Sequence, residues 1–181
     1  ATLAEHDLSY PIDYREEQEA EKVRLQLHAT NVVTQGLQLK HEKACADLAQ
    51  DVNSYATENK ILLSGSSCFN HKDSDPQGVV DDAKDAVSKK IGQDPNTMII
   101  GQDAWRALKR NVSLRSLISN NTNKIITLEH LKEFFEVENI FIGKSIFTDE
   151  NGNFVRIWKD NIVLAFVPNL GSSRTEYDPS Y

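Results

Sequence analysis

The chain has 181 residues, of which 39% are hydrophobic and 26% are charged, a composition typical of a globular protein. Its 27 acidic residues outnumber its 20 Lys and Arg residues, which gives a formal charge of −7. The basic residues are scattered among acids, whereas phosphate binding needs clustered Lys and Arg, so a dedicated nucleic-acid binder is disfavoured. No apolar run approaches the roughly 18 residues that a membrane-spanning helix requires.

The two cysteines, Cys45 and Cys68, are too few for a disulfide framework. The segment from Ala1 to Tyr10 lacks the charged start and apolar stretch of a signal peptide. These features favour an intracellular protein with reduced thiols. The only methionine is Met98, and a chain that opens on Ala1 gives a weak indication of truncation.

The first predicted element is a long helix over residues 13–52. Asp13 and Glu16 predict a capping box, and Pro11 ends any earlier helix. Apolar residues then recur near helical spacing, at Leu25, Ala29, Val32, Val33, Leu37, Ala44, Leu48 and Val52. Uninterrupted, this helix would be about 60 Å long. The stripe follows no clean heptad, so a sheet or a neighbouring subunit is a better partner than a zipper helix.

A short strand is predicted at residues 61–63, followed by a polar loop over residues 64–75. Asp75 and Pro76 then predict the N-cap and first turn of a helix that ends at Gly92. The apolar face of this helix comprises Val79, Val80, Ala83, Val87 and Ile91.

The second half of the chain alternates predicted strands and helices. A buried strand at residues 97–100 precedes a helix over residues 102–111, with Trp105 and Leu108 facing inward. Ser113 is predicted to cap a short turn, and residues 120–123 form a polar loop. Thr127 is predicted to cap a helix whose buried side comprises Leu128, Leu131, Phe134 and Phe135.

Four strands are predicted to follow, at residues 139–142, 144–148, 154–158 and 162–167. Asn151-Gly152 lies between two of them and is a strong hairpin signal. The tail over residues 168–181 is polar and is predicted to be extended or mobile. The predicted fold class is α+β, with a long N-terminal helix joined to a compact α/β part.

Two pairs of residues suggest a metal site, but each pair supplies only half of one. His41 and Cys45 are four residues apart on one face of the long helix, and Cys68 and His71 form a Cys-x-x-His loop. A zinc site needs three or four ligands. Further ligands would have to come from each other or from His6, His28 or His130, in no spacing typical of a zinc family. Chance spacing is therefore the preferred interpretation.

The other candidate sites also have simpler interpretations. The turn from Ser64 to Ser67 lacks the G-x-S-x-G arrangement of a nucleophile elbow, and the sequence contains neither a phosphate-binding nor a dinucleotide-binding glycine motif. Three aspartates alternate with three lysines on one helix, which is typical of a solvated surface; they are Asp81, Asp82, Asp85, Lys84, Lys89 and Lys90. We therefore predict no enzyme activity, no catalytic, cofactor-binding or metal-binding residue, and no cofactor.

Several blocks, in order along nearly the whole chain, resemble the major capsid proteins of tailed bacteriophages. They are Ser9-Tyr10-Pro11-Ile12-Asp13 before the acidic long helix, Asp73-Ser74-Asp75-Pro76 with the helix that follows, Pro95 to Gly101 with Ala104 to Leu108, Ile126 to Leu131 with Phe134 to Gly143, and Ile157 to Pro168. The most specific block is a Pro-Asn-Thr turn, a hydrophobic strand, a Gly and a helix carrying Trp and Leu.

The resemblance implies the Hong Kong 97-like phage capsid fold, with a long spine helix and an α/β axial domain built on a mixed sheet. Residues 1–74 would form the spine helix and the start of the peripheral domain, residues 75–168 the axial domain, and residues 169–181 an extended tail. The family's N-terminal arm, extended loop and C-terminal peripheral strands have no counterpart here, so a fragment of a capsid protein is expected.

The function implied is a structural subunit of a phage or prophage capsid that self-assembles into an icosahedral shell around DNA. Its partners would be copies of itself in pentamers and hexamers, with scaffold, portal or decoration proteins, and without a membrane. The location would be the virion, and the bacterial host cytoplasm before assembly. Two alternatives stay open: an encapsulin-like nanocompartment shell protein, and a metal-dependent hydrolase using His41, Cys45, Cys68 and His71.

Overall fold

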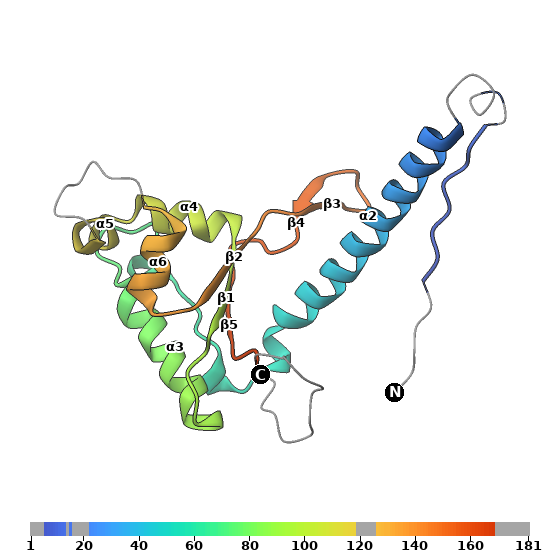
Figure 1. The fold of residues 1–181 in the computed structure, drawn as a ribbon. Coiled ribbons are helices and arrows are strands. Elements are labelled where there is room, and N and C mark those ends of the chain that lie inside the picture. The colour runs from blue at the N-terminus through green and yellow to red at the C-terminus, as the bar shows by residue number, and fades with distance from the viewer. Residues whose placement is uncertain (1–5, 14, 16–21, 119–125, 169–181) are drawn as a thin grey trace. The chain divides into compact units, whose positions relative to one another are not determined.

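The computed structural model describes residues 6–13, 15, 22–118 and 126–168 (Figure 1). The chain divides into two units, Ala1–Leu48 and Ala49–Tyr181. We call them unit 1 and unit 2 and describe each by itself. Within the described residues, no helix combines the length and the apolar character needed to cross a membrane.

Unit 1 consists mainly of helix α2, Lys22–Ala49, whose last residue belongs to unit 2. The predicted long helix is thus confirmed for residues 22–49. It ends three residues before the predicted end, because the Asp51 carboxylate accepts a hydrogen bond from the Asn53 amide and starts the 3-10 helix η1, Val52–Ser54. At the other end, Asp13 accepts from the Arg15 amide at 2.9 Å, while Glu16 lies outside the described residues.

An extended segment before α2 runs back along that helix, which the sequence did not indicate (Figure 1). The His6 ring lies 3.0 Å from the Lys40 ammonium, and the Tyr10 ring meets the His28 ring edge-on at 6.0 Å. Between these contacts, the Leu8 side chain lies against Gly36. The contacts move toward the N-terminus of α2 as residue numbers rise in the segment, so the two run antiparallel.

Unit 2 opens with irregular chain that holds two further 3-10 helices, η2 (Thr57–Asn59) and η3 (Gly65–Ser67). The predicted strand at residues 61–63 is wrong, because this segment pairs with no strand and its backbone is irregular. Its apolar residues have different environments: Leu63 packs against the core, whereas Leu62 is 93% exposed.

Helix α3, Pro76–Ile91, has the predicted boundaries. The Asp75 side chain accepts from the Gly78 amide at 3.1 Å, and Pro76 occupies the first turn, where its missing N–H costs nothing. Gly92 ends the helix with φ of 70°, a left-handed conformation that glycine adopts without penalty.

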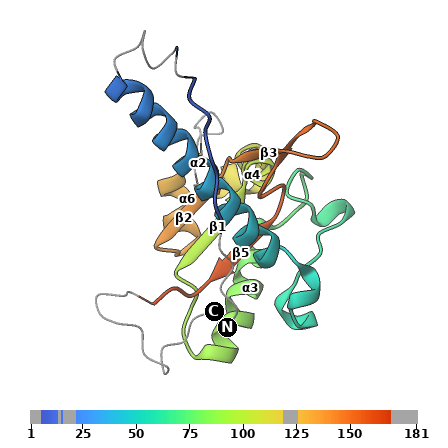
Figure 2. The ribbon, with the colours of Figure 1, turned by 90° about the vertical axis from the view of Figure 1, so that its right-hand side faces the viewer.

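The main sheet has three strands, which Figure 2 shows side by side. Strand β1, Thr97–Gly101, lies between β2, Asn139–Gly143, and β5, Ile162–Ala165. It pairs parallel with β2 and antiparallel with β5, so the predicted mixed sheet is confirmed. Met98 lies opposite Ile140 and Leu164, and this face contributes to the hydrophobic core.

Three helices complete the core of unit 2: α4 (Gln102–Arg110), α5 (Val112–Ile118) and α6 (Leu128–Phe135). The predicted inward positions of Trp105 and Leu108 are confirmed, with 8% and 0% exposure. Together with the sheet face, buried residues of these helices form one cluster; its fully buried large members include Leu108, Leu114, Leu131 and Phe135.

Two helix caps were predicted in this region, and one is correct. Thr127 caps α6, with reciprocal hydrogen bonds between Thr127 and His130. The predicted cap at Ser113 is wrong, because α5 begins at Val112 and the Asn111 side chain accepts from the Leu114 amide at 2.8 Å.

A separate hairpin joins β3, Ile146–Thr148, to β4, Phe154–Arg156. The turn predicted at Asn151-Gly152 is confirmed, and Gly152 has φ of 81°. Both strands, and β5, are shorter than predicted. The predicted loop at residues 120–123 and the tail after residue 168 lie outside the described residues.

Candidate functional site

The predicted half-sites for a metal stay half-sites. The Cys45 sulfur lies 3.7 Å from His41 Nε2 on α2 in unit 1, while Cys68 and His71 share a loop in unit 2. His71 Nδ1 contacts the Asp73 amide and carboxylate at 3.3 and 3.7 Å. Among the described residues, no three His, Cys, Asp or Glu side chains are grouped so as to hold a metal ion.

The serine turn uses its hydroxyls to hold its own backbone. The Ser67 hydroxyl donates to the Ser64 carbonyl at 2.8 Å and accepts from the Ser64 amide at 2.9 Å. These bonds form the capping box of η3. The Ser67 hydroxyl therefore stabilises a 3-10 turn, in keeping with the loop interpretation.

The charged face of α3 is solvated, except for one lysine. Asp81, Asp82 and Asp85 are exposed. The carboxylate of Asp85 pairs with Lys89 and raises the pKa of that lysine. Lys84 departs from the prediction: its ammonium donates to the Phe135 carbonyl at 2.9 Å and lies 3.6 Å from the Glu136 carboxylate. It thereby ties α3 to the C-terminal end of α6, where Glu136 has φ of 53°.

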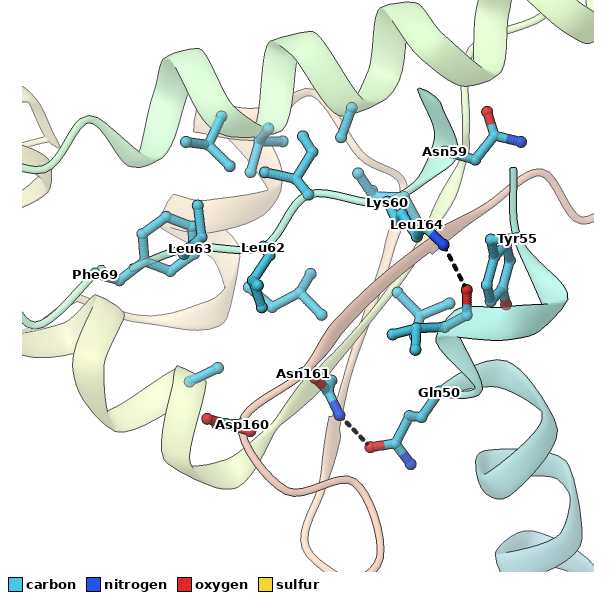
Figure 3. Close-up of a pocket in the computed structure, with 18 of the residues that line it drawn as sticks. Gln50, Tyr55, Asn59, Lys60, Leu62, Leu63, Phe69, Asp160, Asn161 and Leu164 are labelled. Carbon is cyan, nitrogen blue, oxygen red and sulfur yellow. Dashed lines mark hydrogen bonds between the residues drawn. The ribbon is translucent and has the colours of Figure 1, made fainter. Parts of the chain in front are cut away.

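Unit 2 contains a groove of about 570 Å³ with a mainly apolar lining (Figure 3). It lies between α3, α4, β5 and the irregular chain around η2. Its apolar lining includes Leu62, Val79, Val87, Ala107, Ile162 and Leu164. The sequence predicted an apolar face on α3, but the groove itself depends on tertiary packing.

Polar contacts hold one end of the groove. Lys60 donates to the Val52 carbonyl at 2.9 Å, and Asn161 donates to the Gln50 side chain at 2.7 Å (Figure 3). At the rim, Glu58 receives a hydrogen bond from Lys90 at 2.9 Å. A backbone hydrogen bond and the Lys90 ammonium lower the pKa of Glu58, so this rim carboxylate is ionised at neutral pH.

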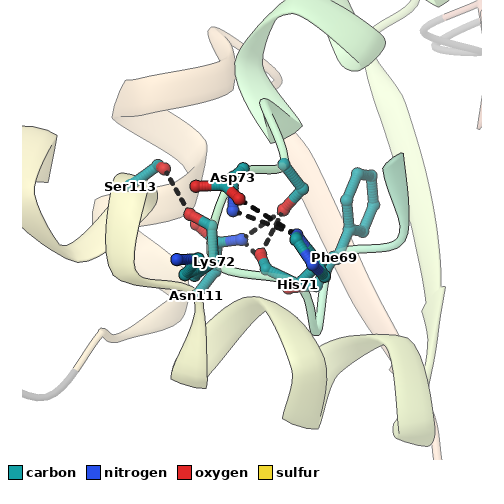
Figure 4. A network of polar contacts seen from close by, with 7 residues as sticks. Phe69, His71, Lys72, Asp73, Asn111 and Ser113 are labelled. Atoms are coloured by element: carbon teal, nitrogen blue, oxygen red, sulfur yellow. Dashed lines mark hydrogen bonds and ion pairs between the residues drawn. The ribbon is translucent and has the colours of Figure 1, made fainter. Parts of the chain in front are cut away.

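A second feature that the sequence did not indicate is the buried Asn111 network (Figure 4). The Asn111 amide group donates to the Phe69 carbonyl at 2.9 Å and to the Ser74 hydroxyl at 2.7 Å. Its oxygen accepts from the Leu114 amide, so one side chain joins the loop before α3 to the start of α5. Asn is a preferred N-cap residue, so the position of Asn111 between two helical patterns is the signal from which its capping role could have been predicted.

The ends of β1 and β2 carry paired glycines, Gly101 and Gly143. A Cβ atom on Gly143 would collide with the Trp158 side chain, and one on Gly101 would collide with the Trp158 and Lys159 carbonyls. The Gly101 amide also donates to the Asn161 carbonyl at 2.8 Å. Because neither glycine has a side chain, Trp158 can pack closely against the ends of β1 and β2, and it is only 7% exposed. We call Gly101 and Gly143 the glycine seat of Trp158.

Large apolar side chains remain exposed on several elements of unit 2. They include Leu62, Val112, Leu117, Phe141 and Phe154, with exposed fractions from 59% to 93%. Single exposed apolar residues are ordinary, and of these five only Leu62 lines the groove. A groove with an apolar lining is a feature typical of surfaces that bind another protein. The exposed apolar side chains and the groove are therefore candidate contact surfaces of unit 2.

Comparison with known proteins identifies the family. Residues 2–180 match the family described as phage major capsid protein E. The chain belongs to this family. The resemblance to phage major capsid proteins is thereby confirmed.

Two curated relatives of this capsid protein are themselves described as major capsid proteins. That of Burkholderia phage BcepMu is 49% identical over 181 residues, covering 99% of this chain and 59% of its own length. That of Pseudomonas phage JBD67 is 25% identical over 153 residues, covering 81% of this chain and 48% of its own length. The chain thus spans about half to three-fifths of the length of these relatives.

A solved structure is also similar. It is a crystal structure of a phage-related protein from Bordetella bronchiseptica RB50, with a TM-score of 0.78 and 30% identity. The match covers 87% of this chain and 51% of that protein. The α+β class and the relation to phage proteins are confirmed.

Proposed function

We propose that this capsid-family chain is a structural subunit of a phage or prophage shell that self-assembles around DNA. The observation that carries the proposal is the 49% identity, over nearly the whole chain, to the major capsid protein of Burkholderia phage BcepMu. A shell protein works by repeated contact between copies, and its role in this proposal is not enzymatic.

The surface of unit 2 supports a role based on contact. It carries exposed apolar side chains and a groove of about 570 Å³ with a mainly apolar lining, and such features are typical of protein–protein interfaces. The charge of −7 suits a protein that encloses DNA without reading its sequence, because tight phosphate binding would require a basic surface.

We further propose the Hong Kong 97-like capsid fold for this chain. In that arrangement α2 is the spine helix, residues 1–74 begin the peripheral domain, residues 75–168 form the axial domain, and residues 169–181 form an extended tail. The 28-residue length of α2 and the mixed sheet β2-β1-β5 with its helices support this assignment. Copies would meet in pentamers and hexamers, and scaffold, portal or decoration proteins would bind the assembled form.

The proposed locations are the host cytoplasm before assembly and the virion afterwards. The test is negative-stain electron microscopy of the protein expressed from its complete gene, alone and with the neighbouring phage genes. Uniform shells or curved sheets of regular subunits are the expected result. A protein that stays monomeric under every condition would overturn the proposal, and shells filled with an enzyme cargo would replace it with a nanocompartment.

A further inference from the structure

Charge is strongly segregated within unit 2. Residues 104–118, which cover most of α4 and all of α5, contain four basic residues and no acidic one. Residues 73–85, which lead into and cover the first half of α3, contain five aspartates and one lysine. In a chain with a net charge of −7, the 104–118 segment stands out as a local region of positive charge.

The positive region also exposes apolar side chains. We define the basic surface as Arg106, Lys109, Arg110, Val112 and Leu117. Val112 is 59% exposed and Leu117 is 60% exposed. Lys109 lies 5.4 Å from the centre of the Trp105 ring, and Arg106 lies 3.4 Å from Asp103. Arg110 is exposed and makes no salt bridge with any described residue. Apolar residues flanked by arginine are the composition typical of interface cores.

The apolar groove has the opposite charge at one rim. Ala86 of α3 lines both the groove and a neighbouring hollow, whose charged lining comprises Glu58, Asp82, Asp85, Lys89 and Lys90. Lys89 pairs with Asp85 and Lys90 with Glu58, which leaves the negative charge of Asp82 uncompensated at this rim. Asp81 precedes Asp82 on α3 and is exposed as well. Asp81 makes no ion pair within the described part of the chain, so its charge is available to a partner.

Apolar side chains make up most of the groove lining, and one of them projects into solvent. Leu62, which belongs to the lining of the groove, is 93% exposed (Figure 3). Covering so exposed a leucine with a partner is favourable, because its apolar surface is removed from water.

We propose that the groove of one copy receives the basic surface of a second copy. This proposal rests on the self-assembly proposed above and names the surfaces that make one of its contacts. Val112 and Leu117 enter the groove beside Leu62, and Arg106 and Arg110 pair with Asp81 and Asp82 of α3. The two surfaces are different patches of the same chain, so each copy has one of each to offer to its neighbours.

The apolar and charged parts of this contact have separate roles. Burial of the apolar side chains supplies most of the affinity. The charge pairs select the partner and the register, because a misplaced copy brings like charges together. Exposed pairs are screened by salt, so the contact weakens as the ionic strength rises from about 50 mM to about 500 mM.

The test is a charge-reversal cycle in the protein expressed from its complete gene. One variant carries Asp81→Lys and Asp82→Lys, a second carries Arg106→Glu and Arg110→Glu, and a third carries all four changes. Sedimentation velocity and electron microscopy measure the fraction of protein in particles. We expect each double variant to lose at least about tenfold of the assembled fraction and the fourfold variant to recover most of it.

Matched controls carry equal charge changes on other exposed positions. Glu133→Lys with Glu138→Lys mirrors the α3 change, and Lys144→Glu with Lys159→Glu mirrors the change on the basic surface. The controls should assemble like the wild type, and every variant should keep the wild-type melting temperature.

The outcomes separate this contact from the proposed function. A wild-type protein that forms no particles overturns the self-assembly itself. Particles that form equally well in both double variants overturn the contact and leave self-assembly intact. Double variants that fail without recovery in the fourfold variant also overturn it, because complementary charges would then not be paired.

Discussion

Unit 1 and unit 2 contain comparable apolar side chains but differ in how far they bury them. In unit 2, large residues such as Leu108, Leu131 and Phe135 are between 0% and 1% exposed. In unit 1, the large apolar residues Leu27 and Leu39 of α2 are 61% and 36% exposed, and the buried apolar residues of its described part are the small Ala29 and Ala46. Unit 2 therefore has a core of its own.

The difference teaches that α2, in its described part, buries large apolar side chains only partly; Leu25, Val32, Val33 and Leu37 are half-buried. An isolated helix of moderate propensity is marginal in water, and most helical stability in proteins comes from tertiary packing. The extended segment over residues 6–13 supplies only a few contacts along α2, such as that of Leu8 with Gly36. Equivalent substitutions in the two units should therefore change the free energy of unfolding by different amounts, and in one case with opposite sign.

The largest contrast is expected for leucine truncation. Leu108→Ala removes a fully buried side chain and should lower the free energy of unfolding by about 3 kcal/mol or more. Leu27→Ala removes an exposed side chain of α2 and should change it by no more than about 0.5 kcal/mol. Urea unfolding followed by circular dichroism checks both values, and equal effects would contradict the contrast.

Glycine replacement should give effects of opposite sign. Gly143→Ala forces a Cβ into Trp158 and should destabilise unit 2 by about 2 to 3 kcal/mol. Gly36→Ala lies in mid-helix, where the new Cβ meets only the flexible end of Leu8, and alanine propensity should stabilise α2 by up to about 1 kcal/mol. Thermal unfolding measures both, and a stabilised Gly143→Ala variant would rule out the proposed glycine seat.

The Asn111 network should be broken in proportion to the hydrogen bonds removed. Asn111→Ala removes two donors and one acceptor from a site that is 2% exposed, which should cost about 2 kcal/mol. Asn111→Asp keeps the acceptor that caps α5 but leaves the Phe69 carbonyl without its donor. Denaturant unfolding of both variants measures the change. An Asn111→Ala variant with the wild-type free energy of unfolding would show that the network is dispensable.

The smallest effect is local and depends on pH. The carboxylate of Asp149 accepts from the amides of Asn151 and Asn153 at 2.9 and 2.8 Å, and the backbone bond from Asn153 is the main cause of its lowered pKa. A lowered folded-state pKa stabilises the hairpin above the ordinary Asp value of 3.8, and this stabilisation is lost as pH falls through the folded pKa.

Hydrogen exchange at the Asn151 and Asn153 amides, corrected for intrinsic rates, should therefore quicken below about pH 4 while β1 is unaffected. Asp149→Asn keeps an acceptor without the titration and is the matched control, so its amides should show no such step. An identical step in that variant would assign the effect to another group.

Local signals in the sequence predicted the elements that depend on neighbouring residues. Asp75 with Pro76, Gly92, Thr127 and Asn151-Gly152 each specify a cap or turn within a few residues, and each is found where predicted. The inward side of α4 follows from hydrophobic patterning, whereas the mixed sheet was expected only from the resemblance to phage capsid proteins.

The failures arise where a distant partner decides the structure. Residues 61–63 have strand composition but meet no strand, so tertiary packing makes them irregular. Ser113 and Asn111 are both residue types that cap helices, and Asn111 is the one that caps α5. The burial of Asn111 beside Ser74 depends on residues far apart in the sequence, so neighbouring residues could not predict it. The glycine seat under Trp158 likewise depends on the register between β1 and β2.

Native-state hydrogen exchange of the unassembled protein tests the difference between the units most directly. The account predicts that amides of β1, at Met98 and Ile100, exchange slowest, because they open only with the core of unit 2. Amides of α2 between Leu27 and Leu39 should exchange much faster. Protection of α2 equal to that of β1 in the unassembled protein would contradict the claim that only unit 2 is stabilised by a core of its own.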